Sequence, residues 1–111
     1  MARPNPAFMS GVPELLVLRL LCRQEMYGYE VVQGIRLSTN DVIVLAEGVI
    51  YPTLHSLEKK GFLKAAAKTV DGRKRIYYQV TAKGKKRFKE ISSEWKKISS
   101  VINASLERSY V

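Results

Sequence analysis

The chain has 111 residues, of which 46% are hydrophobic, enough for one small domain with its own core. Nineteen Lys and Arg outnumber ten Asp and Glu, so the net charge is +9. The single cysteine, Cys22, excludes an intramolecular disulfide, and with only one histidine, His55, a protein-only zinc site is not expected. No hydrolase, P-loop or dinucleotide motif occurs, so we expect no cofactor and no enzymatic activity.

The positive charge is concentrated in the second half of the chain. Residues 59–97 hold fourteen of the nineteen basic side chains, whereas residues 1–58 are slightly negative. This asymmetry indicates a face for a polyanion, although a solvated helix surface would have the same composition. Residues 1–10 lack the apolar run of a secretory signal, and the longest apolar stretch, 15–22, is too short to cross a bilayer. We therefore expect a cytoplasmic protein that does not enter the membrane.

The first predicted elements are an arm, residues 1–12, and a helix. Pro13 and Glu14 favour a helix start, because proline suits the first turn and a carboxylate suits the positive end of the helix dipole. The run 15–22 is apolar on nearly every side, so we expect something beyond its own small domain to cover it. Residues 24–26 are expected to form a connector.

Two further helices are predicted in the middle of the chain. Residues 27–36 carry an apolar stripe at helical spacing. The turn residues 38–41 follow, and the β-branched run 42–45 predicts a short strand. A helix is then predicted over about residues 47–60, ended by Gly61. One face of this helix is apolar, and the opposite face carries small, polar or basic side chains.

A basic hairpin is predicted next. Residues 62–69 and 75–80 have the composition of strands, and the Asp-Gly pair in the connecting residues 70–74 is a strong hairpin signal. Its tip would hold three consecutive cations, which are Arg73, Lys74 and Arg75.

The last predicted element is a long helix over about residues 82–107, with Thr81 as its N-cap. Apolar side chains recur along it at intervals of three and four, a heptad pattern typical of coiled coils. They are Phe88, Ile91, Trp95, Ile98 and Ile102. We therefore expect a homodimer built on this helix. Trp95 has a second interpretation as a platform for a bound ligand, but an aromatic residue at this spacing more often packs in a core.

The order of elements predicts an α+β, mainly helical fold: a winged helix-turn-helix with a two-stranded wing and a long C-terminal dimerisation helix. We place the winged helix-turn-helix DNA-binding domain at residues 13–81 and the dimerisation helix at residues 82–111. In such folds the second helix of the pair fits the major groove of duplex DNA. The wing beside it can reach phosphates or the adjacent minor groove.

The sequence also resembles the PadR-type transcriptional regulators. The matching motifs are Tyr27-Gly28-Tyr29-Glu30, the run EGVIYPTLHSLEKKG at 47–61, the run RKRIYYQVTAKG at 73–84, and Trp95. Each motif is weak alone, but their order and spacing cover roughly residues 14–105 and resemble the short subfamily with one C-terminal helix. The resemblance implies a homodimeric repressor whose first helix packs on the partner's last helix. In some relatives a small phenolic or flat hydrophobic effector binds between the subunits, on a tryptophan that matches Trp95.

The sequence departs from the family pattern at two places. Family members often have arginine where this chain has His55 and Ser56, which leaves the operator sequence open. They often have serine near the N-cap of the recognition helix, where this chain has Ala46. That change costs about 1 kcal/mol if nothing replaces the cap.

We predict a sequence-specific repressor that binds a near-palindromic DNA operator as a homodimer. The predicted DNA-binding residues are Gly48, Tyr51, Thr53, His55, Ser56, Lys59, Lys60, Arg73, Lys74 and Arg75. The predicted dimer interface consists of Leu15, Leu18, Phe88, Ile91, Trp95, Ile98 and Ile102. For any single residue of the third helix, a merely exposed or locally packed side chain is an equally good interpretation.

Two other classes of function fit parts of the sequence. The final helix combines lysines with an aromatic face, as interfacial membrane helices do, but its narrow apolar stripe suits a partner helix better. A winged helix used only as a protein-interaction module is the second alternative, and the basic wing argues against it. Binding to liposomes stronger than binding to DNA would favour the membrane alternative.

Overall fold

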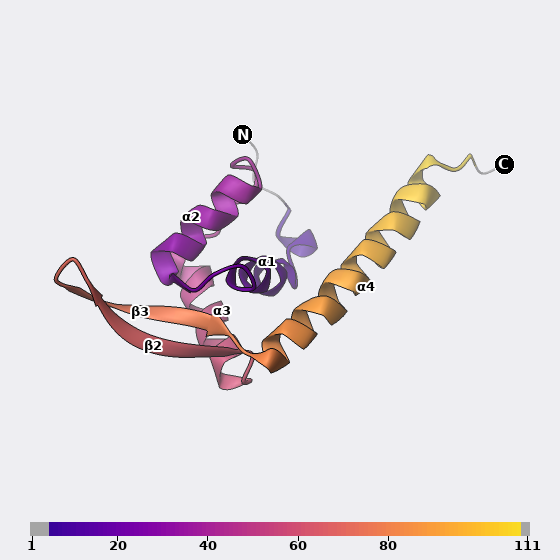
Figure 1. Ribbon diagram of the computed structural model, residues 1–111. Helices are drawn as coiled ribbons and strands as arrows, with labels where there is room; N and C mark the ends of the chain where they lie inside the picture. Colours follow the sequence, from indigo (N-terminus) through magenta and orange to yellow (C-terminus); the bar gives the residue numbers. More distant parts are fainter. Residues whose placement is uncertain (1–4, 110–111) are drawn as a thin grey trace.

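The computed structural model describes residues 5–109, so the ends of the predicted arm and of the C-terminal segment, 1–4 and 110–111, lie outside the described residues. The chain forms η1 (Pro6–Phe8), α1 (Val12–Leu21), β1 (Met26–Tyr27), α2 (Gly28–Ser38), α3 (Glu47–Lys59), β2 (Leu63–Val70), β3 (Arg73–Val80) and α4 (Ala82–Glu107). Figure 1 shows α1, α2, α3 and the sheet gathered in one body, from which α4 projects. The predicted α+β, mainly helical winged fold is confirmed.

The core lies between the three short helices and the inner face of the sheet. Each helix contributes side chains spaced three or four residues apart, because that spacing places them on one face. The buried members of this core are Val17, Leu18, Leu21, Val31, Ile35, Leu45, Ile50, Leu54, Leu57, Leu63 and Tyr78. The apolar face predicted for α3 is therefore the face that is buried.

The first helix is covered mainly by its own chain. Leu18 is 0% exposed, so it has no surface to offer a second subunit, and we remove it from the predicted dimer interface. Leu15 is only partly buried and keeps accessible surface. Pro13 lies in the first turn of α1, as expected from its missing N–H.

The predicted strand at 42–45 is wrong. Val42 and Val44 are exposed, and the Ile43 N–H donates to the Thr39 hydroxyl at 3.1 Å instead of to a neighbouring strand. A strand forms instead where the predicted connector meets the predicted second helix: β1 pairs antiparallel with β3, giving the sheet order β1-β3-β2, and the helix begins at Gly28 and not at Tyr27. A two-residue strand has no periodicity, so its pairing could not be recognised from local pattern.

The hairpin is tighter than predicted. Asp71 and Gly72 alone form the turn, with φ of 52° and 75°, and β2 and β3 pair without interruption up to Val70 and Arg73. Two consecutive positive φ values match the right-handed twist of the strands, and Asp-Gly adopts them readily. Arg73 and Lys74 therefore belong to β3, together with Arg75, and not to the connecting loop.

The start of α4 is fastened to the end of α3. The Thr81 hydroxyl accepts from the Gly84 N–H at 3.0 Å, which confirms the predicted N-cap, and donates to the Gly61 carbonyl at 2.7 Å. The Lys83 ammonium donates to the Lys60 carbonyl at 2.8 Å. One turn further on, α4 is also tied to α1, because the Arg87 guanidinium donates to both Glu14 carboxylate oxygens, at 2.8 and 3.2 Å.

Beyond these ties, α4 leaves the body of the protein (Figure 1). Phe88 and Ile91 still pack against the core of their own chain, but the apolar residues after them do not. Among the described residues, no helix has both the length and the apolar character that a membrane span requires.

Candidate nucleic-acid interface

The exposed face of α3 carries the small and polar side chains that the sequence predicted. Gly48, His55 and Ser56 are exposed, and the space around a side chain at Gly48 is empty. Thr53 is less free, since its hydroxyl donates to the Val49 carbonyl of its own helix at 2.8 Å. Ala46 is the N-cap and supplies no side-chain hydrogen bond, so the cap that the sequence lacked is not replaced.

Tyr51 lies on α3 where that helix faces the start of α2. Its ring covers Gly28, and a Cβ on Gly28 would lie 2.5 Å from the ring carbons. The glycine of the Tyr27-Gly28-Tyr29-Glu30 motif therefore leaves room for the Tyr51 ring, which would have to shift if residue 28 had a side chain. Tyr51 keeps 37% of its surface exposed, so the ring packs while its far side stays accessible.

The cations of the wing are divided between its two faces. Because side chains alternate along a strand, Lys74 lies on the inner face, which also carries the buried Tyr78, whereas Arg73 and Arg75 lie on the outer face. The cross-strand partner of Arg75 is Lys68, so the outer face is strongly basic. The single cationic cluster predicted at the tip is thus two groups with opposite orientations.

The outer-face side chains hold one another in place. The Arg75 guanidinium lies 4.4 Å from the centre of the Tyr27 ring, and that ring meets Tyr77 edge to face at 5.5 Å between centres. The Lys68 ammonium lies 5.1 Å from the centre of the Tyr77 ring and contacts the Glu25 carboxylate. Cation–π contacts of this kind fix the side chains against the sheet. The sequence pattern predicted Arg75 as a free cation and did not reveal this chain of stacked cations and tyrosine rings.

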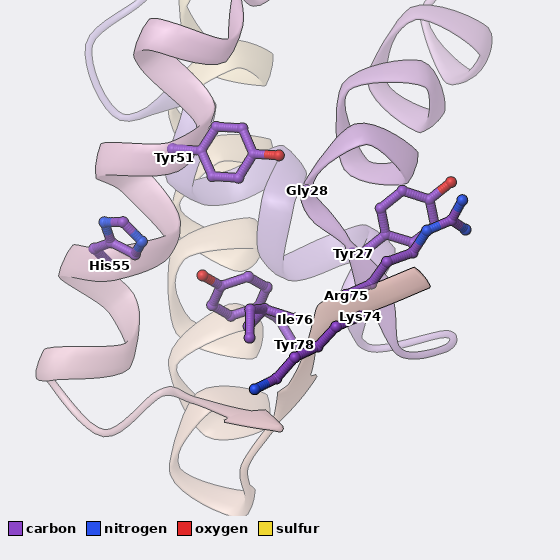
Figure 2. A pocket seen from close by; sticks show the side chains of 8 residues that line it. All are labelled: Tyr27, Gly28, Tyr51, His55, Lys74, Arg75, Ile76 and Tyr78. Atoms are coloured by element: carbon purple, nitrogen blue, oxygen red, sulfur yellow. The ribbon is translucent and has the colours of Figure 1, made fainter. Parts of the chain in front are cut away.

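A pocket of about 330 Å³ opens between α3 and the wing, and we call it the α3–wing pocket. Its lining residues are Tyr27, Gly28, Tyr51, His55, Lys74, Arg75, Ile76 and Tyr78. Figure 2 shows Tyr51 and His55 on α3, with Tyr78, Lys74 and Arg75 on the strand that faces it. Four predicted DNA-binding residues therefore meet in one place, although they come from segments about twenty residues apart.

A third feature is an exposed apolar stripe on the free part of α4. We call the α4 stripe the residues Trp95, Ile98, Val101, Ile102 and Leu106. Trp95 is 51% exposed, and the others are similarly or more exposed. Val101 and Leu106 were not predicted, because they lie next to the heptad positions and not on them: the position that would follow Ile102 is Ser105.

An exposed polar helix beside a basic two-stranded wing, on a helix-turn-helix core, defines a winged-helix protein of the kind that binds DNA. The sequence profile of the Transcriptional regulator PadR-like family matches residues 17–90, and the chain belongs to this family. Its members are transcriptional regulators that bind DNA, not enzymes.

Related proteins agree with this assignment. A transcriptional regulator from Clostridium thermocellum superposes with a TM-score of 0.83 at 31% identity, over 91% of this chain and 96% of that one. A PadR-like transcriptional regulator from Bacillus cereus has a TM-score of 0.81 at 29% identity, over 93% and 99%. An uncharacterised protein from Lysinibacillus sphaericus is 36% identical over 98 residues, which are 87% of this chain and 90% of that protein.

Proposed function

We propose that the protein is a homodimeric repressor that acts in the cytoplasm on a near-palindromic operator. The α4 stripe carries this proposal, because its five large apolar side chains are exposed in the single chain. Trp95, Ile98 and Ile102 have coiled-coil spacing, and Val101 and Leu106 lie beside them. Pairing two such helices would bury them. The chain would then divide into three parts: the arm at 1–12, the DNA-binding domain at 13–81 and the dimerisation helix at 82–111.

In this dimer, the two α3 helices would enter successive major grooves, with half-site centres about 34–36 Å apart. Gly48, Thr53, His55 and Ser56 would face base edges, since they line the exposed side of α3. Lys59, Lys60, Tyr51 and the wing cations would contact phosphates. Phosphate contacts set the register, whereas base contacts choose the sequence.

We also propose that a small hydrophobic or phenolic effector binds between the two α4 helices, beside Trp95. The exposed indole supports this, because it offers a flat face for stacking next to the partner helix. Such a ligand would release the operator only if it bound more tightly to a dimer with a different separation of its α3 helices.

The experiment that tests the proposal combines a salt titration of binding to random duplex DNA with selection of genomic fragments by the purified protein. Steep salt dependence together with an enriched near-palindrome would support a dimeric, sequence-specific regulator. Enriched sites without two-fold symmetry would refute the symmetric dimer. An absence of duplex binding, with strong binding to anionic vesicles, would refute the DNA function.

Removing the wing cations is expected to weaken binding to every DNA sequence alike. The variant Arg73→Ala/Lys74→Ala/Arg75→Ala should flatten the log–log salt dependence by roughly 0.9 for each lost phosphate contact. The matched control, Lys89→Ala/Lys96→Ala/Lys97→Ala, removes the same charge from exposed positions on α4 and should leave the slope close to that of the wild type. Equal slopes for the wing variant and the wild type would remove the wing from the interface.

A further inference from the structure

The α3–wing pocket has the chemistry of an anion site. Tyr51 and Tyr78 bring hydroxyl groups, His55 brings an imidazole, and Lys74 brings an ammonium group, while no carboxylate is among the lining residues. In the part of the chain that the structure describes, no hydrogen bond joins the hydroxyl of Tyr51 or Tyr78 to another protein group. Tyr51 is exposed, and the Tyr78 oxygen is not a buried atom without a partner, so it reaches the surface. Both hydroxyls are therefore available to a ligand that accepts hydrogen bonds.

Tyr78 is suited to donate such a bond. Its ring is buried in the core, and burial, the Glu58 carboxylate and Tyr51 all raise the pKa of Tyr78 above its ordinary value. The phenol thus stays protonated across the physiological range and can donate to an anion without adding negative charge. The rings and Ile76 add apolar walls that a sugar can contact.

The place of the pocket determines which anion could reach it. It lies between α3 and β3, and under the proposed function α3 occupies the major groove while the wing lies beside the adjacent minor groove. The strand that separates these two grooves must then cross the pocket. Every position along that strand presents a phosphodiester with a deoxyribose on either side.

We propose that the α3–wing pocket is the seat of one backbone phosphodiester in each half-site of the operator, and this rests on the proposed function. Tyr51, Tyr78 and Lys74 hold the phosphate oxygens, and Ile76 contacts the neighbouring sugar. Gly28 is a positioning residue, because any larger residue would displace the Tyr51 ring from its place. The seat sets the register of α3 in the groove without reading a base.

The test places a neutral methylphosphonate linkage at each phosphate of the selected operator in turn. With the wild-type protein, a methylphosphonate at one position per half-site, on the strand between the two grooves, should weaken operator binding on the order of tenfold. The loss arises because the neutral linkage removes the charge that the α3–wing pocket holds. In the variant Tyr51→Phe/Lys74→Gln, the loss at that position should shrink to less than about twofold, while the losses at other positions persist. Tyr51→Phe keeps the ring against Gly28, and Tyr78→Phe, which removes only the hydroxyl, should shrink the loss at the same position.

The matched control is Lys64→Gln, which removes one exposed positive charge from the outer face of the wing and should leave the wild-type profile intact. Suppose that the wild type binds the operator and that the Tyr51→Phe/Lys74→Gln variant has the same methylphosphonate profile as the wild type. That result would overturn the proposed phosphodiester site but not the proposed function. Failure of the wild type to bind any duplex would overturn the proposed function, and the seat with it.

A second arm separates the DNA backbone from a free anion. Inorganic phosphate is titrated into the free protein while the Gly28 amide is followed by NMR. Saturation by free phosphate, combined with an unaltered methylphosphonate profile in the variant, would identify a small-anion site and overturn the proposal. If the affinity loss at that one methylphosphonate position is smaller in the variant than in the wild type, the proposed phosphodiester site is supported, whether or not free phosphate also binds.

Discussion

Gly84→Ala is expected to lower the free energy of unfolding by about 3 kcal/mol. Gly84 lies in the first turn of α4, and a Cβ there would lie 2.1 Å from the Phe62 carbonyl oxygen. That oxygen cannot move away easily, because it accepts a hydrogen bond from the Thr81 N–H at 3.0 Å. The start of α4 would therefore have to shift away from the end of α3. Chemical denaturation at one fixed protein concentration measures the effect.

Gly48→Ala is the matched control for this prediction. Gly48 is also helical, but nothing lies within 4 Å of the position that a Cβ would take there, so alanine should stabilise the protein by about 0.5–1 kcal/mol. The two substitutions make the same chemical change and should have opposite signs. Equal stability of Gly84→Ala and the wild type would show that the α3–α4 junction is not closely packed.

Trp95→Ala is expected to raise the dissociation constant of the proposed dimer about a thousandfold. A symmetric dimer loses two indoles at once, and truncation of a buried interface tryptophan costs roughly 2 kcal/mol or more for each copy. Because Trp95 is exposed in the single chain, its removal should leave the fold of the subunit intact. Sedimentation equilibrium over a range of concentrations measures the dissociation constant.

The control for Trp95 is its neighbour Glu94, which is exposed and outside the α4 stripe, so Glu94→Ala should leave the dissociation constant nearly unchanged. A Trp95→Ala protein as dimeric as the wild type would contradict a packing role. Such a result would favour the ligand platform, which quenching of Trp95 fluorescence by flat hydrophobic or phenolic compounds would detect.

Local signals in the sequence were sufficient for most of the secondary structure. The Asp71-Gly72 turn, the Thr81 N-cap and the spacing of Ile50, Leu54 and Leu57 each act within a few residues of one another. For that reason they predicted the hairpin, the bounds of α4 and the buried face of α3. The order of these elements predicted the winged fold, which the structure confirms. The resemblance to the family added the regulatory class, which the family profile then confirmed.

The sequence pattern could not by itself locate the dimer surface. Leu15 and Leu18 are both leucines and lie about one helical turn apart, yet Leu18 is fully buried in its own chain and Leu15 is only partly buried. Phe88 and Ile91 continue the same heptad pattern as Trp95, but they pack on their own core. A periodic stripe shows that a face will be covered, whereas the path of the chain decides what covers it.

By itself, the sequence determined the helices, the hairpin and the basic character of the wing, because propensity, capping and periodicity are local properties. Only the tertiary structure decided that β1 replaces the strand expected at 42–45, and that Arg75 stacks on Tyr27 while Lys74 faces α3. It also brought Tyr51 onto Gly28. These contacts join residues that are far apart in the chain, and their free energy exists only once the helices and the sheet have packed together.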